Sequence, residues 1–222
     1  MGLGSSHPLE QRLTALTGAC VAPLLVIDHS GLLIPLLTGT FLFLSLLFLF
    51  RFKTLENIHH QLSWLLFGFF YLPLLLGHLV PLRLLDQGQR WIFLTLMIIM
   101  SCDTFAYFVG SKIGKRKLYP SVSPNKSVEG AIGGLLGSVF AVLLARYTFM
   151  PVIGLVDGVL IGLLLGTAGQ LGDLFESLLK RACQVKDSGN IIPGHGGLLD
   201  RLDSLLFAFP LAYYIARYAY GG

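Results

Sequence analysis

The feature that most constrains this chain is a succession of apolar stretches, each long enough, or nearly so, to cross a lipid bilayer. A membrane-spanning helix needs about 20 mostly apolar residues. Such stretches lie at residues 12–28, 32–50, 62–80, 91–111, 129–149, 153–180 and 202–220. Hydrophobic residues make up 54% of the 222 residues and charged residues only 13%, so one soluble core could not bury this apolar surface. The pattern predicts an all-α fold, a polytopic transmembrane bundle of about seven helices in one domain, 1–222.

The lysines and arginines predict how this bundle is oriented, because cytoplasmic loops carry an excess of them. If the N-terminus is cytoplasmic, most of the 16 basic residues fall on that side. They lie in the N-terminal tail, after the second and fourth stretches, and after the sixth. We therefore expect an integral membrane protein, with N-terminal helices in 1–90 and the polar loops of 91–222 facing the cytoplasm.

The 26 glycines of the chain cluster in apolar runs such as 129–138 and 162–173. Small residues at these spacings let helix backbones approach closely in lipid, where packing drives association. We expect close helix contacts in both runs.

Carboxylates occur within these apolar runs. Asp103 lies about halfway along the fourth stretch, and Asp173 follows the run "LLLGTAGQLG". A charge at the centre of a membrane helix costs roughly 2.5–3.5 kcal/mol on insertion scales, so it needs a basic partner, a cation or a polar cavity. Both a structural ion pair and a metal or substrate site fit these two residues.

The segment "DLFESLLKR" at 173–181 places polar groups on one face of a helix. Asp173, Glu176 or Ser177, and Lys180 are spaced at i, i+3 or i+4, and i+7. That face offers a carboxylate near the membrane and a cation two turns later. It is suited to a phosphate bound through a metal ion.

A glycine-rich loop follows, from Gly189 to Gly197, after Lys186 and Asp187. Backbone N–H groups in such a loop can approach an anion closely. Asp200 and Asp203 come next, at the start of the last helix, where acidic residues also stabilise the helix end. His195 fits either a loop-organising hydrogen bond or a phosphate contact.

A third polar cluster lies at 110–134. Its cations Lys112, Lys115, Arg116 and Lys117 fit both the topology rule and contact with anionic lipid headgroups. In "SPNKSVEG", two hydroxyls and Lys126 precede Glu129 at the start of a helix, an arrangement with phosphate-binding potential. The segment "GSKIGKRK" at 110–117 is not a P-loop, because its glycine spacing differs from that motif and Arg116 stands where the motif has Ser or Thr. Together the three clusters indicate metal-assisted phosphoryl or nucleotidyl transfer.

The run "SLLKRACQVKDSGNIIPGHGGLLDRLD" at 177–203 resembles the signature of the phosphatidate cytidylyltransferase (CDP-diacylglycerol synthase) family, with every constrained position met. The blocks at 103–118, 123–134 and 171–177 agree with it. The resemblance implies an enzyme of phospholipid biosynthesis that joins CTP and phosphatidic acid to give CDP-diacylglycerol and pyrophosphate. It also implies a catalytic half in 91–222 and a location in a bacterial inner (plasma) membrane. The further implications are Mg²⁺, with room for a second cation, and a homodimer, with no nucleic-acid partner.

The resemblance also implies roles for individual residues. Asp173 and Asp200 match the family's metal-binding carboxylates. The expected catalytic set is Asp173, Lys180, Arg181, Lys186, Asp187, Asp200 and Arg201. The expected substrate-binding set is Ser123, Lys126, Ser127, Glu129, His195, Gly196 and Gly197.

Two other functions are compatible with parts of the pattern. A CTP-dependent lipid kinase of the dolichol or phytol type would use similar cytoplasmic carboxylates and cations, and would release CDP rather than pyrophosphate. An ion-coupled transporter would use Asp103 and Asp173 as ion sites, but paired broken segments in two halves are not visible in the sequence.

Overall fold

The computed structural model describes Leu46, Ser63, Phe67, Gly68, Tyr71 and residues 74–185 and 199–221. The chain divides into two compact units, Met1–Pro81 and Leu82–Gly222. The spans expected at 12–28, 32–50 and most of 62–80 lie outside the described residues. The second unit holds the segments to which the sequence assigned chemistry.

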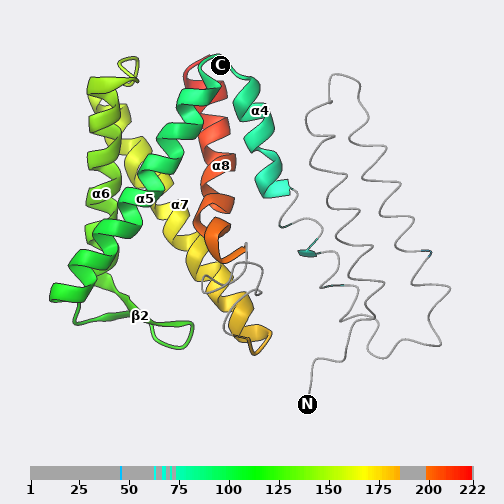
Figure 1. The fold of residues 1–222 in the computed structure, drawn as a ribbon, viewed down its shortest axis with the longest axis vertical. Coiled ribbons are helices and arrows are strands. Elements are labelled where there is room, and N and C mark those ends of the chain that lie inside the picture. The colour runs from blue at the N-terminus through cyan, green and yellow to red at the C-terminus, as the bar shows by residue number, and fades with distance from the viewer. Residues whose placement is uncertain are drawn as a thin grey trace. The chain divides into compact units, whose positions relative to one another are not determined.

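The described elements follow one another along the chain (Figure 1). They are α4 (Leu79–Leu84), α5 (Gly88–Ile113), β1 (Lys117–Tyr119), β2 (Ser123–Ser127), α6 (Val128–Thr148), α7 (Leu155–Ala182) and α8 (Leu199–Ala219). Each of the expected helices at 91–111, 129–149, 153–180 and 202–220 is confirmed to within a few residues. Within the described part of the chain, α5, α6 and α7 are long and apolar enough to cross a membrane, which confirms the membrane character of this half.

The four long helices pack around one core. α6 contacts α5 and α7, α8 contacts α7 and α5, and α5 also contacts α7. Fully buried apolar side chains from each helix fill the centre: Leu94 and Ile98 of α5, Val142 of α6, Leu165 of α7 and Leu206 of α8. Large apolar side chains on the outer faces, such as Leu136 and Phe140, are exposed, as expected for helices that face lipid.

The predicted close approach of glycine-rich helices is confirmed. The buried residues of α6 include Gly130, Gly133, Gly134 and Gly137, and those of α7 include Gly158, Gly162, Gly166 and Gly169. A Cβ at Gly162 would lie 2.8 Å from the Cα of Val139 on α6, so only glycine fits there without moving the helices apart. The α6–α7 contact is therefore made backbone to backbone.

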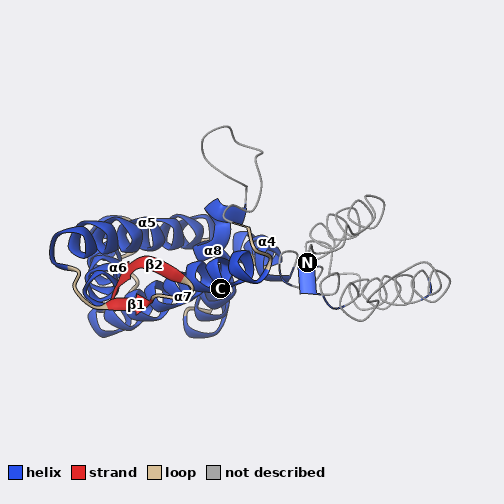
Figure 2. Ribbon diagram, turned by 90° about the horizontal axis from the view of Figure 1, so that it is seen from below, coloured by secondary structure: helices blue, strands red, loops and turns tan. Residues whose placement is uncertain are grey.

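A short β-hairpin corrects the all-α prediction. β1 and β2 pair antiparallel, with Lys117 opposite Ser127 and Tyr119 opposite Ser123. Figure 2 shows the hairpin lying across the ends of α6 and α7, and β2 contacts both helices. Pro124 is tolerated within β2 because a two-stranded sheet consists of edge strands. These strands are too short and too polar to give an alternating hydrophobic pattern, so the sequence did not predict them.

Candidate active site

One end of the second unit collects the polar segments of five elements. α5 and α7 end there, α6 and α8 begin there, and the hairpin joins α5 to α6 at the same end (Figure 1). This follows from chain order, because successive long helices run in alternating directions. The basic residues gathered at this end are Lys112, Lys115, Arg116, Lys117, Lys126, Lys180, Arg181 and Arg201.

The start of α6 fixes the position of β2. Ser127 is the N-cap residue, and its Oγ accepts a hydrogen bond from the backbone N–H of Gly130 at 3.1 Å. A hydroxyl at this position satisfies one of the unpaired N–H groups of the first turn. Ser127 is buried, so its hydroxyl stabilises the helix start that the sequence predicted, whatever further contact it makes. Ser123, at the other end of β2, is half-buried.

Glu129 holds the turn between α5 and β1. Its carboxylate accepts hydrogen bonds from the backbone N–H groups of Lys115 at 3.1 Å and Arg116 at 3.2 Å. The side chains of both basic residues are exposed. The sequence grouped Glu129 with the substrate-binding residues, and in the structure its oxygens face protein backbone.

Lys126 and Asp173 form the first ion pair of the site. The Nζ of Lys126 lies 2.5 Å from Oδ2 of Asp173, and the two side chains are 27% and 30% exposed. β2 carries the lysine, and Arg181 of α7 helps to hold the hairpin in place because its Nε donates to the carbonyl of Val122 at 3.3 Å. The pair therefore joins the hairpin to α7.

Lys180 lies between two carboxylates, one from its own helix and one from α8. Its Nζ is 2.5 Å from Oε2 of Glu176 and 2.8 Å from Oδ1 of Asp200. The Glu176 side chain is completely buried, whereas that of Asp200 is 13% exposed. The shared helix face predicted for Glu176 and Lys180 is confirmed, and α8 adds the third member.

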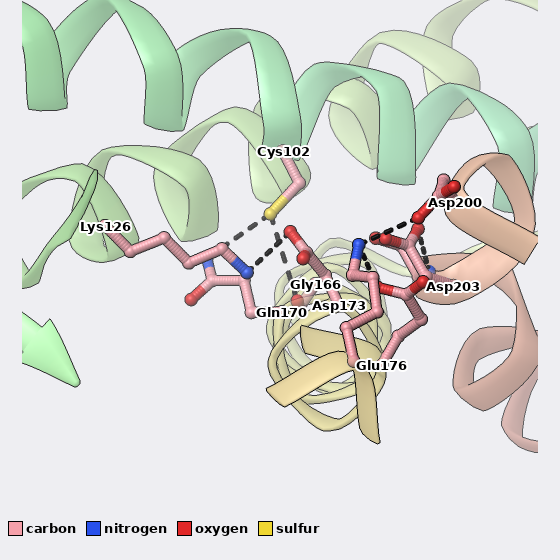
Figure 3. Close-up of polar contacts among 10 residues, drawn as sticks. Cys102, Lys126, Gly166, Gln170, Asp173, Glu176, Asp200 and Asp203 are labelled. Carbon is pink, nitrogen blue, oxygen red and sulfur yellow. Dashed lines mark hydrogen bonds and ion pairs between the residues drawn. The ribbon is translucent and has the colours of Figure 1, made fainter. Parts of the chain in front are cut away.

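The close contact between α7 and α8 brings further carboxylates to the same place. A Cβ at Gly172 would lie 2.5 Å from the carbonyl oxygen of Asp203, so the glycine lets α8 pass directly beside Asp173. The charge of Asp173 is near enough to act on Asp103 of α5 and on Asp203. Figure 3 shows Asp173, Glu176, Asp200 and Asp203 gathered in one region. We call these four residues, with Asp103, Lys126 and Lys180, the acid–lysine cluster.

A polar clamp that the sequence analysis missed lies one turn before Asp173. The Nε2 of Gln170 donates to the carbonyl of Ala131 on α6 at 2.9 Å. It also donates to Sγ of Cys102 on α5 at 3.3 Å (Figure 3). A Cβ at Gly134 would lie 2.8 Å from this nitrogen, so the glycine leaves room for the amide. The signal was present, because Gln170 is the amide in an otherwise mostly apolar run at 160–171.

The remaining predicted site residues lie on α8 and in the segment before it. Arg201 is exposed on α8. Lys186 and Asp187, and His195, Gly196 and Gly197 of the glycine-rich loop that follows them, lie outside the described residues. The contacts described for the acid–lysine cluster therefore come from the hairpin and the helix ends.

The donor chemistry of the cluster fits a magnesium ion. Magnesium prefers oxygen ligands and is usually held by one or two carboxylates, with water and substrate phosphates completing the shell. Asp173 and Asp200 supply such oxygens. Over residues 74–185 and 199–221, no three His, Cys, Asp or Glu side chains form a ligand set for one ion.

Comparison with known proteins places the chain in a family. The model of the cytidylyltransferase family matches residues 4–219. The chain is 48% identical over 147 residues to the phosphatidate cytidylyltransferase of Bacillus subtilis, a match that covers 65% of this chain and 54% of the relative. It is 47% identical over 128 residues to the enzyme of that name from Staphylococcus aureus, covering 57% and 48%.

The chain spans about half the length of the curated relatives it matches. The family model, in contrast, extends over nearly the whole chain, including the hairpin and the four long helices that carry the acid–lysine cluster. By this match the chain belongs to the cytidylyltransferase family.

Proposed function

We propose that this protein is a phosphatidate cytidylyltransferase, a nucleotidyltransferase that moves the cytidylyl group of CTP onto phosphatidic acid and releases pyrophosphate. The observation that carries the proposal is the acid–lysine cluster at one end of three membrane-length helices. A water-soluble nucleotide and a membrane lipid can meet only at such a boundary. The name of the relatives supports the choice of both substrates.

The charge of the cluster favours metal-dependent chemistry. Within the cluster, five carboxylates accompany two lysines: Asp103, Asp173, Glu176, Asp200 and Asp203 lie with Lys126 and Lys180. A triphosphate would be repelled by this excess negative charge unless a cation came with it. Asp173 and Asp200 would hold the ion, and a bound Mg²⁺ supplies charge neutralisation and polarisation of the phosphoryl oxygens.

In this reaction the main task of the protein is to position the lipid phosphate and the α-phosphorus of CTP. A phosphate oxygen of phosphatidic acid bonds to the α-phosphorus of CTP, and the bond between that phosphorus and the bridging oxygen to the β-phosphate breaks. Pyrophosphate carries away the electron pair of the broken bond. A phosphate monoester dianion is a competent nucleophile near neutral pH, so no strong general base is required. The lysines and arginines at this end would neutralise charge on the leaving pyrophosphate.

The proposal includes a location for the site. We infer that this end of the molecule faces the cytoplasm of a bacterial cell at the inner membrane, because exposed basic residues gather there and cytoplasmic loops are rich in them. The lipid phosphate would then reach the cluster at headgroup depth. Assembly as a homodimer also belongs to the proposal and rests on family resemblance alone.

The proposal is tested by the products. The full chain, purified in mild detergent, is given CTP, phosphatidic acid and Mg²⁺, and pyrophosphate, CDP and CDP-diacylglycerol are measured. We expect pyrophosphate and CDP-diacylglycerol in equal amounts, and only when phosphatidic acid is present. Release of CDP with phosphorylation of a lipid alcohol would identify the kinase instead, and would refute the transferase.

A matched pair of variants ties the activity to the cluster. Asp200→Asn removes a carboxylate from the cluster, whereas Asp157→Asn removes one from the first turn of α7 at the opposite end of the unit. We expect loss of product formation in the first and wild-type rates in the second. Equal activity of the two variants would remove Asp200 from the proposed site.

A further inference from the structure

Glu176 is the most deeply buried acid of the described chain, with a side chain that is 0% exposed. A buried carboxylate is costly unless it is paired. Glu176 lies one helical turn before Lys180 on α7, and its Oε2 is 2.5 Å from the ammonium. The mechanism proposed above gives this residue no task, although it lies within the acid–lysine cluster.

The ammonium of Lys180 is shared. It also lies 2.8 Å from Oδ1 of Asp200, which belongs to α8 and is more accessible than Glu176. A divalent cation that approaches Asp200 must therefore compete with an ammonium for the same carboxylate. Glu176 cannot take over the cation's role easily, since its oxygens are sealed from solvent.

We propose that Glu176 is a positioning residue that allows Asp200 to exchange the ammonium of Lys180 for a divalent cation. This inference rests on the proposed function. The cation takes Asp200, and the ammonium stays within the cluster because Glu176, on the same helix face, continues to hold it. Lys180 then remains near the phosphates rather than swinging into solvent.

The physical reason is competition between two carboxylates for one ammonium. With both acids present, loss of the Asp200 contact leaves Lys180 paired with Glu176, so the exchange is inexpensive. Without the Glu176 charge, the Lys180 ammonium is paired with Asp200 alone. A cation that binds Asp200 must then displace this ammonium, and no second carboxylate is there to pair with the ammonium. Removing the Glu176 charge should therefore weaken cation binding at a carboxylate that Glu176 does not itself supply.

The test measures cation binding without turnover. Mn²⁺ is titrated into the full-length protein in detergent, with no nucleotide or lipid, and the unbound ion is followed by its electron paramagnetic resonance signal. Glu176→Gln keeps the shape of the side chain and removes its charge. We expect Mn²⁺ binding to weaken by about 10–100-fold, the usual effect of removing a group that supports a metal ligand. Binding as tight as in the wild type would overturn the proposal.

Two further variants exclude a simple loss of folding or of charge. Asp157→Asn removes a carboxylate from the same helix far from the cluster and should bind Mn²⁺ as the wild type does. The double variant Glu176→Gln with Lys180→Met has the same net charge as the wild type but no ammonium beside Asp200. We expect it to bind Mn²⁺ more tightly than the wild type. Binding that is only equal, or weaker, would mean that Glu176 does not act through Lys180 and would refute the proposal.

The kinetic prediction follows the same logic. Glu176→Gln should raise the Mg²⁺ concentration needed for half-maximal activity, whereas its KM for phosphatidic acid should stay near the wild-type value. Glu176→Asp, which restores the charge on a shorter side chain, should recover part of the Mg²⁺ response. A wild-type protein that binds Mn²⁺ but releases no pyrophosphate would refute the proposed function and leave the binding result standing.

Discussion

The two lysines of the cluster occupy different surroundings. Lys126 comes from the hairpin and meets one acid, Asp173, in a pair of which about a third is exposed. Lys180 comes from α7 and lies between two acids, one of them completely buried. A single ion pair near water gains little energy, whereas a buried group of charges depends on each member. The first contact, although its ammonium nitrogen is buried, involves one partly exposed acid and should open at lower cost than the second.

The largest expected effect distinguishes the two lysines by stability. Lys180→Met leaves Glu176 buried without its counter-charge and should destabilise the protein by about 3–5 kcal/mol. Lys126→Met leaves a partly solvated Asp173 and should cost about 1 kcal/mol or less. Unfolding by sodium dodecyl sulfate in mixed micelles, followed by circular dichroism, measures both. Equal losses of stability in the two variants would show that the two lysines do not differ in this way.

The next prediction asks whether the two ion pairs serve one site. Asp173→Asn and Asp200→Asn should each lower the rate of pyrophosphate release by roughly 100-fold or more, as expected when a preorganised charge is removed from a reacting centre. Both proteins should remain folded, because each retains the shape of the side chain. If only one variant loses activity, the two pairs belong to separate sites.

A smaller effect is expected at the α7–α8 contact that supports Lys180. Gly172→Ala places a methyl group against the carbonyl of Asp203 and should cost about 1–3 kcal/mol through overpacking. Gly158→Ala is the matched control on the same helix, because its nearest atom would be 3.4 Å away. There the better helix propensity of alanine should leave stability unchanged or raise it by up to about 1 kcal/mol. Thermal unfolding of the two variants in parallel makes the comparison.

The smallest effect is expected on the Lys126 side. Ser127→Ala removes the hydroxyl that caps α6 and should destabilise the protein by about 1 kcal/mol. Because the cap also positions β2, the Lys126–Asp173 pair should loosen, and the KM for CTP should rise more than kcat falls. Ser127→Asp, which provides another capping oxygen, should restore the stability. A Ser127→Ala protein with unchanged melting temperature would show that β2 is held by other contacts.

The helices of this half were predictable because their signal is local. A run of about 20 apolar residues specifies a membrane helix without reference to the rest of the chain, so the ranges 129–149 and 153–180 agree with α6 and α7. The helix start at Ser127 was predictable for the same reason, because its N-cap contact with Gly130 lies within one turn. The i, i+4 relation of Glu176 and Lys180 is likewise a property of helix geometry.

The hairpin and the partner of each charged group were not predictable in this way. The five residues of β2, four polar residues and a proline, form a strand only because β1 and the ends of two helices lie beside them. The sequence placed Lys126, Asp173, Lys180 and Asp200 in one polar region but did not say which pairs would form. Gln170 also escaped notice, because its two acceptors come from α5 and α6.

By itself, therefore, the sequence determined that this chain is a membrane protein and which carboxylates and cations could act on phosphates, because apolar length and charge type are properties of individual segments. Only the tertiary structure decided that Lys180 is shared between a buried Glu176 and an accessible Asp200. That choice depends on how closely α8 approaches α7 at Gly172, and electrostatic energies depend on distance and burial, which no single segment specifies.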